Sequence, residues 1–305
     1  MTKLYLITGF LGAGKTTFMH SFARLFTNCR SAIVVNEFGK QGVDGALLED
    51  LGIQMEEINN GSIFCACKIE QFEDALLRLQ SEQLEYIFLE ASGLSDPTAV
   101  GTILGQREKF PDIEYVGAIC LVDGARFMKI YQTARVCRMQ LAVSDMIIIN
   151  KCDLATREQV DEITAIVRGQ KPNRPVYTTT YGRIEPEWLL SMGTKPADDA
   201  AKGEIHTVDI TLRKILMHIS GFNKNDLVSF LRMFAEETYC IKGFVNLAEG
   251  KFVVDCVGPL VDLRPFDGTC EEENSLVILF GNALPAKRAI KEAMTRFPNG
   301  KVTMD

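Results

Sequence analysis

Short apolar runs alternate with amphipathic stretches through the first two thirds of the chain. The apolar runs are near-continuous, which is typical of strands buried on both faces, and the stretches between them carry apolar residues at helical spacing. Strands that alternate with helices predict a mostly parallel α/β sheet covered by helices on both faces. The expected strands are residues 3–8, 32–35, 85–90, 115–122, 145–149 and 176–179. The expected helices are 16–26, 71–79, one opened by Asp96 and Pro97, and 156–170. The last of these begins with a capping-box pattern of Thr156 and Gln159.

The last third of the chain has a different pattern. Residues 192–206 lack periodicity and are rich in Gly, Pro, Asp and Lys, which indicates a linker between a first domain at 1–191 and a second at 207–305. The second domain is expected to be a smaller α+β layer with helices on one face of an antiparallel sheet. Its expected strands are 208–212, 240–247, 252–257 and 276–280, and its helices are 284–296 and one with Leu227, Phe230, Leu231 and Phe234 on one face.

Composition narrows the class of protein. The chain has 305 residues, 47% of them hydrophobic and 24% charged, with a net charge of -7, as in an ordinary globular protein. It has no basic stripe to neutralise phosphates, so we expect small molecules or proteins as partners and no nucleic acid. No stretch approaches the ~20 apolar residues of a membrane span, and the apolar N-terminal run is too short for a signal peptide, which favours a cytoplasmic location. Nine cysteines without a disulfide spacing are expected to be mostly reduced.

The segment GFLGAGKTT, Gly9 to Thr17, satisfies the full P-loop pattern, and it lies between an expected strand and an expected helix. Its backbone N–H groups would point at phosphate oxygens, Lys15 would neutralise the β and γ phosphates, and the Thr16 hydroxyl would ligate Mg²⁺. The expected nucleotide-binding residues here are Gly9, Gly12, Ala13, Gly14, Lys15, Thr16 and Thr17.

A second motif, INKCD, closes the strand at 145–149 and has the form NKxD. Asp153 can accept two hydrogen bonds from guanine N1–H and the 2-amino group, a pattern that adenine does not offer, while the stem of Lys151 packs on the base. With Asn150, these residues predict specificity for GTP over ATP.

A third motif, YIFLEASGLSDP, places Glu90 at the carboxyl end of an apolar strand and Gly93 three residues later. Ligands of open α/β sheets bind at that edge. Glu90 is expected to hold Mg²⁺ or its waters, and the Gly93 amide to bond the γ phosphate and report its loss. The alternative is a helix start at which Asp96 serves only as a cap.

The order GFLGAGKTT, NEFGKQGVD, EASGLSDP and INKCD resembles the CobW-type GTPases, relatives of UreG and HypB that load metals into enzymes. The resemblance covers nearly the whole first domain and continues more weakly through YCIKGFVNL in the second. It implies that residues 36–44 are the first switch segment, with Glu37 and Asp44 near the Mg²⁺ and the attacking water. With Lys15 and Glu90, these carboxylates are the expected catalytic residues for GTP hydrolysis.

The same family normally carries a Cys-x-Cys-Cys triplet after Asn-Gly, whose thiolates bind the transported metal. This chain departs from the pattern, because Ser62, Ile63 and Phe64 precede Cys65, and Cys67 lies beyond it. Two thiolates in a loop favour soft or borderline cations such as Zn²⁺, Cu⁺, Co²⁺ or Ni²⁺ and leave a site open for transfer. Glu37, Glu57, a client or a second subunit would complete it. The alternatives are a redox-sensitive thiol pair without metal and simple packing.

These motifs together predict a GTP-hydrolysing metallochaperone or cofactor-insertion protein that delivers metal to a client enzyme. The cysteine segment lies between the two nucleotide-sensing segments, so nucleotide state is expected to open or close it. One alternative is a protein whose cargo is a metallated cofactor such as a corrinoid, or a GTPase gate or activator of a corrinoid or other metalloenzyme that carries no metal itself. The others are a small-molecule kinase and a non-enzymatic metal or thiol sensor. The second domain offers no catalytic constellation and is assigned to client recognition or homodimer contacts.

Overall fold

The structure is a computed structural model of the 305-residue chain. It describes residues 1–36, 53–58, 69–95, 97–106, 108–192, 212–266, 273–281 and 284–304. Contacts between Cα positions divide the chain into two compact units, Met1–Tyr131 with Arg135–Asp209, and Ile210–Asp305 with Gln132–Ala134. Several predictions lie outside the described residues: Glu37, Asp44, Cys65, Cys67, Asp96, and all but the first residue of the linker at 192–206.

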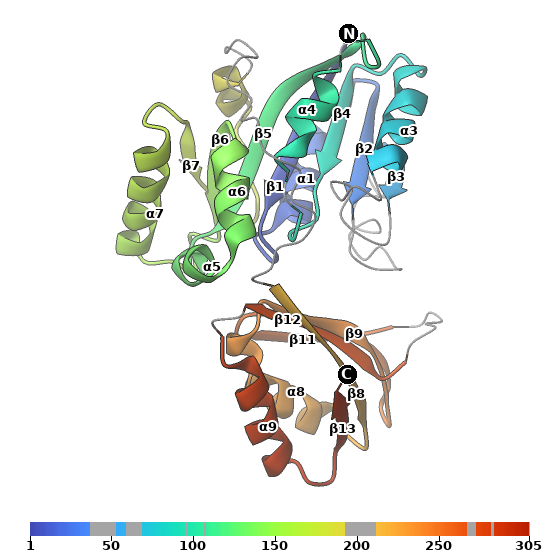
Figure 1. Cartoon of the computed structure of the whole chain (residues 1–305), viewed down its shortest axis with the longest axis vertical. Coiled ribbons are helices and arrows are strands. Elements are labelled where there is room, and N and C mark those ends of the chain that lie inside the picture. The colour runs from blue at the N-terminus through green and yellow to red at the C-terminus, as the bar shows by residue number, and fades with distance from the viewer. Residues whose placement is uncertain are drawn as a thin grey trace. The chain divides into compact units, whose positions relative to one another are not determined.

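The first unit contains a seven-stranded sheet in the order β3-β2-β4-β1-β5-β6-β7, and every pairing in it is parallel (Figure 1). This arrangement confirms the predicted α/β class. The strands are β1 (Thr2–Gly9), β2 (Ser31–Asn36), β3 (Gln54–Ile58), β4 (Tyr86–Glu90), β5 (Ile113–Asp123), β6 (Met146–Asn150) and β7 (Val176–Thr178).

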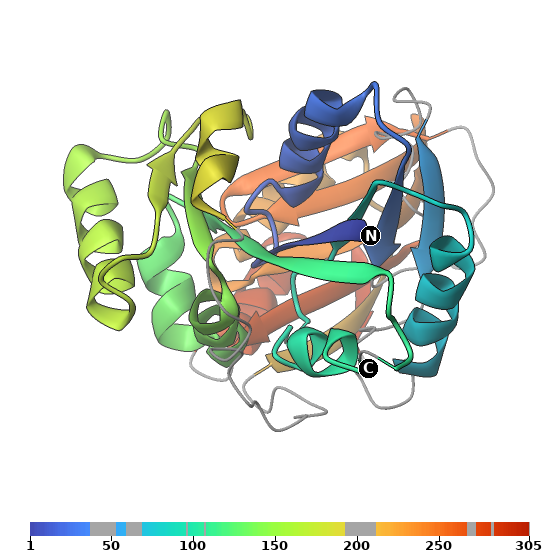
Figure 2. The ribbon, with the colours of Figure 1, turned by 90° about the horizontal axis from the view of Figure 1, so that it is seen from above.

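Helices cover both faces of this sheet. Along β1, Leu4 and Leu6 face a core with α3 and α4, whereas Tyr5 and Ile7 face a core with α1. Figure 2 shows α1, in blue, on one side of the strands and α3 and α4, in cyan to green, on the other. Burial on both faces explains why the central strands read as unbroken apolar runs. The helices are α1 (Lys15–Ala23), α3 (Ile69–Gln80), α4 (Ala99–Leu104), α5 (Phe127–Thr133), α6 (Arg135–Val143) and α7 (Arg157–Gln170), with 3₁₀ turns at Arg24–Phe26 and Pro186–Ser191.

The second unit is a six-stranded sheet in the order β11-β10-β9-β12-β8-β13, with antiparallel ladders throughout. Helices α8 and α9 bury their apolar sides in one core with the inward residues of these strands, so both lie on the same face, as predicted (Figure 1). The elements are β8 (Leu212–Ser220), α8 (Lys224–Arg232), β9 (Cys240–Leu247), β10 (Gly250–Val257), β11 (Leu260–Pro265), β12 (Ser275–Gly281), α9 (Ala286–Arg296) and β13 (Lys301–Met304), with a 3₁₀ turn at Ala235–Glu237.

Some predicted elements were wrong or missed. Helix α4 begins at Ala99, two residues after Pro97. The predicted strand at 208–212 lies outside the described residues except for its last residue, Leu212, where strand β8 begins. Phe234 is buried but follows the end of α8. Strands β3, β11 and β13 and helices α5 and α6 were not predicted. None of the helices in the described part of the chain has both the length and the apolar character that a bilayer crossing requires.

Candidate nucleotide-binding site

The P-loop connects the end of β1 to the start of α1, and its glycines have a positive φ, which residues with a side chain rarely adopt. Gly14, the N-cap of α1, has a φ of 93°, and Gly9 has a φ of 136°. A Cβ at Gly9 would lie 2.3 Å from the carbonyl oxygen of Leu121 on β5. The loop therefore packs directly on the sheet, which leaves the first N–H groups of α1 available to an anion. Lys15 is 8% exposed, and its Nζ lies 3.5 Å from the carbonyl oxygen of Phe10.

Thr16 and Glu90 meet at the carboxyl edge of the sheet. The Thr16 hydroxyl donates to Glu90 Oε1 at 3.2 Å, although 74 residues separate the two in sequence. Glu90 is 4% exposed at the end of β4, the neighbour of β1. A hydroxyl and a carboxylate are the hard oxygen ligands that Mg²⁺ prefers, so the pair fits the ion expected with a bound nucleotide.

The turn after β4 packs on the P-loop. A Cβ at Gly93 would lie 2.7 Å from the backbone nitrogen of Leu11, so only glycine fits here without a shift. Ser92, Gly93 and Ser95 are buried, and Ser95 N–H donates to the Ser92 carbonyl at 2.9 Å. The structure thus brings Glu90, Gly93 and the P-loop to one place.

Asn150 links the INKCD motif to two other loops. Its Nδ2 donates to the Ala13 carbonyl of the P-loop at 2.9 Å, and its Oδ1 accepts from Gly182 N–H at 3.0 Å. Gly182 in turn lies against the start of α1, because a Cβ there would come within 2.7 Å of Phe18 N. Both ends of the Asn150 amide are therefore engaged by the protein backbone, so Asn150 orients the site's loops.

Lys151 is held by a residue that sequence reasoning missed. Its backbone is left-handed, with a φ of 59°, and its Nζ forms a 2.9 Å ion pair with Asp123 Oδ2. Asp123 is 4% exposed, and its Oδ1 accepts from the N–H groups of Ala125 and Arg126, both at 3.1 Å. An acid at the end of an apolar strand directly before Gly124 was the available signal. Asp153, the expected guanine reader, is exposed to solvent at the end of the motif.

Three of the described thiols, Cys120, Cys137 and Cys152, are placed for packing. Burial raises the pKa of Cys120 to about 12, and burial also raises the pKa of Cys137 and of the half-buried Cys152. The Cys152 thiol also donates to the Ile149 carbonyl at 3.2 Å. Among the described residues, no group of three or more His, Cys, Asp or Glu is placed to hold a metal ion. The expected metal thiols, Cys65 and Cys67, lie outside these residues.

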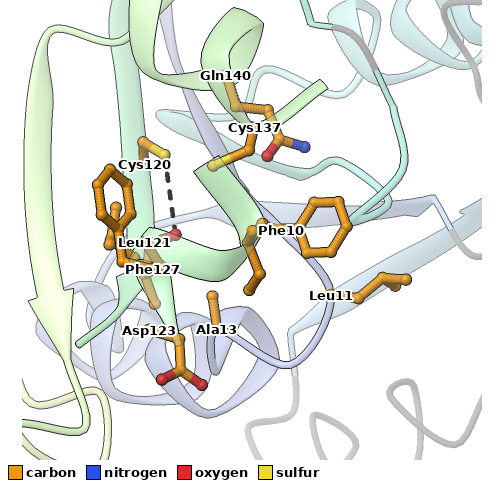
Figure 3. Close-up of a pocket in the computed structure, with 11 residues that line it drawn as sticks. Phe10, Leu11, Ala13, Cys120, Leu121, Asp123, Phe127, Cys137 and Gln140 are labelled. Atoms are coloured by element: carbon orange, nitrogen blue, oxygen red, sulfur yellow. Dashed lines mark hydrogen bonds between the residues drawn. The ribbon is translucent and has the colours of Figure 1, made fainter. Parts of the chain in front are cut away.

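A small cavity lies on the inner side of the P-loop, lined by Phe10, Leu11, Cys120, Cys137 and Gln140, among others (Figure 3). Its volume is about 10 Å³, which is about the room that one water molecule needs. The cavity is too small for a nucleotide.

The parallel sheet, the strand-loop-helix unit at Gly9–Lys15 and the carboxylate of Glu90 beside Thr16 define the class of P-loop nucleotide-binding proteins. The NKxD motif, joined to the P-loop through Asn150, is typical of the guanine-specific members of that class. The family model described as "CobW/HypB/UreG, nucleotide-binding domain" matches residues 3–178, and the chain belongs to this family.

Three relatives illustrate the family. The chain is 31% identical over 234 residues to the zinc chaperone YjiA of Escherichia coli, covering 74% of this chain and 70% of YjiA. It is 28% identical over 222 residues to the zinc chaperone YeiR of the same organism, covering 72% and 67%. It is 26% identical over 215 residues to the zinc-regulated GTPase metalloprotein activator 1 of Saccharomyces cerevisiae, covering 61% of this chain and 50% of the yeast protein.

Proposed function

We propose that this protein binds GTP with Mg²⁺, hydrolyses it to GDP and phosphate, and uses the nucleotide state to deliver a thiophilic divalent metal to a client metalloprotein. The observation that carries the proposal is the meeting of the three motifs at one sheet edge. Thr16 contacts Glu90, Gly93 packs on the P-loop, and Asn150 joins the guanine motif to the same loop.

Each residue of the candidate site has a role in this proposal. Lys15 and the backbone N–H groups of Gly12 to Thr17 bind the phosphates, and Asp153 reads guanine beside the stem of Lys151. Thr16 and Glu90 would hold Mg²⁺, which neutralises charge on the β and γ phosphates when it is bound. Glu37 and Asp44 are proposed to orient the attacking water, on the resemblance of residues 36–44 to the family's first switch segment.

The cargo site is proposed to be built on Cys65 and Cys67, with Glu37 or Glu57 as a further ligand. The sheet register supports coupling between this segment and the nucleotide. Ile58, the last described residue before the cysteine segment, pairs with Asn36 on β2, and Val35 pairs with Glu90 on β4. Strand β3, which precedes the segment in sequence, therefore ends two strands from β4, at the same edge of the sheet as Glu90.

Zinc is the proposed cargo, because the two Escherichia coli relatives are named zinc chaperones and thiolates suit Zn²⁺. Co²⁺ and Ni²⁺ remain competitors for the same donors. We place the protein in the cytoplasm, with no nucleic-acid or membrane partner, and assign residues 207–305 to client recognition or homodimer contacts.

The test is an anaerobic assay of phosphate release with GTP and with ATP, in the presence of Zn²⁺, Co²⁺ or Ni²⁺. The wild type is compared with the double variant Cys65→Ser, Cys67→Ser, and with Cys29→Ser as a matched control, because Cys29 is a partly exposed thiol outside the motifs. We expect the wild type to hydrolyse GTP and not ATP, at a rate that depends on the added metal. The double variant should lose this dependence on metal, and Cys29→Ser should keep it. Turnover without any metal response would favour the gate, and transfer of phosphate to a small molecule would favour the kinase.

A further inference from the structure

Helix α6 carries a fully buried amide beside the nucleotide site. Gln140 has no solvent exposure, and its Nε2 donates to the carbonyl oxygens of Gly93 and Ser95, both at 3.2 Å. Because both partners are acceptors, the NH₂ group must face them, and the reversed amide would set three oxygens together. One side chain therefore holds both ends of the turn after β4.

The helix behind this amide is firmly placed. Helix α6 packs over β1 and β5, and Gln140 lines the small cavity behind the P-loop together with Cys137, one turn earlier on α6 (Figure 3). At the other side, Gly93 contacts Leu11 of the P-loop. The turn is thus fixed between the P-loop and α6, and Gln140 makes the hydrogen bonds of the α6 side.

The Gln140 amide is not optimal for the stability of the fold, because one of its polar atoms is buried without a hydrogen bond to any described group. No described group donates to Gln140 Oε1, which is also buried, so the side chain leaves one polar atom without a hydrogen bond in order to satisfy two carbonyls. A leucine of similar size would remove that cost but leave both carbonyls without their donor. The variant thus loses the donor of two buried carbonyls and removes one unsatisfied atom, so we expect a moderate loss of stability together with a large change in the turn.

We infer that Gln140 is a positioning residue for the γ phosphate: it fixes the Gly93–Ser95 turn so that the Gly93 N–H is set for the third phosphate of GTP. This inference rests on the proposed function. GDP lacks the third phosphate, so the hydrogen bonds of Gln140 affect the binding of the triphosphate and leave that of the diphosphate unchanged.

The experiment measures the Kd of the full-length protein for GDP and for a non-hydrolysable GTP analogue, with Mg²⁺, in three variants. For Gln140→Leu we expect the analogue to bind about tenfold more weakly and GDP to bind as in the wild type. Cys137→Ala is the matched control, because it disturbs the same helix and cavity without touching the turn, and it should leave the ratio of the two Kd values unchanged. Gln140→Glu places a carboxylate against two carbonyl oxygens, so its defect should be larger at pH 8 than at pH 6, where protonation gives the group a donor.

The outcomes separate the two proposals. A Gln140→Leu variant whose analogue and GDP affinities fall together, or whose ratio equals that of the wild type, overturns the positioning role. If Gln140→Leu does not fold, Gln140→Glu decides by its pH dependence, and a ratio that does not change with pH overturns the inference. A wild type that binds neither guanine nucleotide overturns the proposed function and this inference with it.

Discussion

The buried side-chain amides of Asn150 and Gln140 form hydrogen bonds to different loops of the candidate nucleotide site. Asn150 bonds to the P-loop itself, at Ala13, and to the loop at Gly182. Among the described residues, the Gln140 amide bonds to the turn beyond Glu90, at Gly93 and Ser95. In the proposed function, the P-loop binds the phosphates that GDP and GTP share, whereas the turn is proposed to bind the third phosphate alone. On this proposal, the interactions that bind any guanine nucleotide are separate from those that distinguish GTP from GDP.

The largest effect on nucleotide affinity is expected from Asp153→Asn, at the residue proposed to bind the guanine base. Two hydrogen bonds from guanine to a carboxylate are lost or weakened, at about 1.5 to 3 kcal/mol each, so GTP affinity should fall by about a hundredfold or more. The asparagine NH₂ can instead donate to the 2-oxo group of xanthine. Competition binding with GTP, ATP and XTP checks this, and a variant that keeps its preference for GTP would remove Asp153 as the guanine reader.

A smaller effect on nucleotide affinity is expected from Asn150→Ala, and this variant tests the difference between Asn150 and Gln140 directly. The variant leaves the Ala13 carbonyl and the Gly182 N–H without their partner, which costs about 1 to 3 kcal/mol for each buried group. We expect lower stability to urea and weaker binding of GDP and of the GTP analogue by the same factor. This is the opposite of the selective loss expected for Gln140→Leu, and a selective loss in Asn150→Ala would contradict the division between the two amides.

The contrast also shows what the sequence can and cannot reveal. Central strands such as β1 and β6 were predicted because both faces are buried and most positions are apolar. Helix α6 was missed because Gln140 occupies a buried position, which breaks the apolar spacing that marks a helix face. Strand β11 was missed for the opposite reason, because most of its residues are exposed or partly exposed at the edge of its sheet.

The site divides in the same way. The P-loop and NKxD residues follow from local motifs, whose spacing alone dictates their chemistry. The partners of those residues do not, because Asp123 is 28 residues from Lys151, and Asn150 is 137 residues from Ala13. Such contacts depend on strand order, which places the ends of β1, β5 and β6 side by side. Sequence reasoning therefore found the groups expected to touch the nucleotide and missed the contacts that hold them.

The smallest effect is expected at the start of α7, which begins four residues after Asp153, the last residue of the guanine motif. Thr156 Oγ1 accepts from Gln159 N–H at 3.3 Å, and Gln159 Oε1 accepts from Thr156 N–H at 2.9 Å, so the predicted capping box is confirmed. Thr156→Ala should cost about 1 kcal/mol of stability and leave the ratio of GDP to GTP-analogue binding unchanged. Urea denaturation measures the cost, and the binding assay above serves as its control.

The same variant has a pH signature. A hydrogen bond to its own backbone N–H, and then one from Thr156, lower the pKa of the exposed Glu158 in the first turn of α7. A carboxylate whose pKa is lowered on folding stabilises the fold above its unfolded pKa, and this contribution is lost as the pH falls through the folded pKa. In Thr156→Ala the pKa of Glu158 should rise toward its ordinary value, because one of its two donors is gone. An NMR titration of the Glu158 carboxyl checks this, and an unmoved pKa would mean that the backbone donor alone sets it.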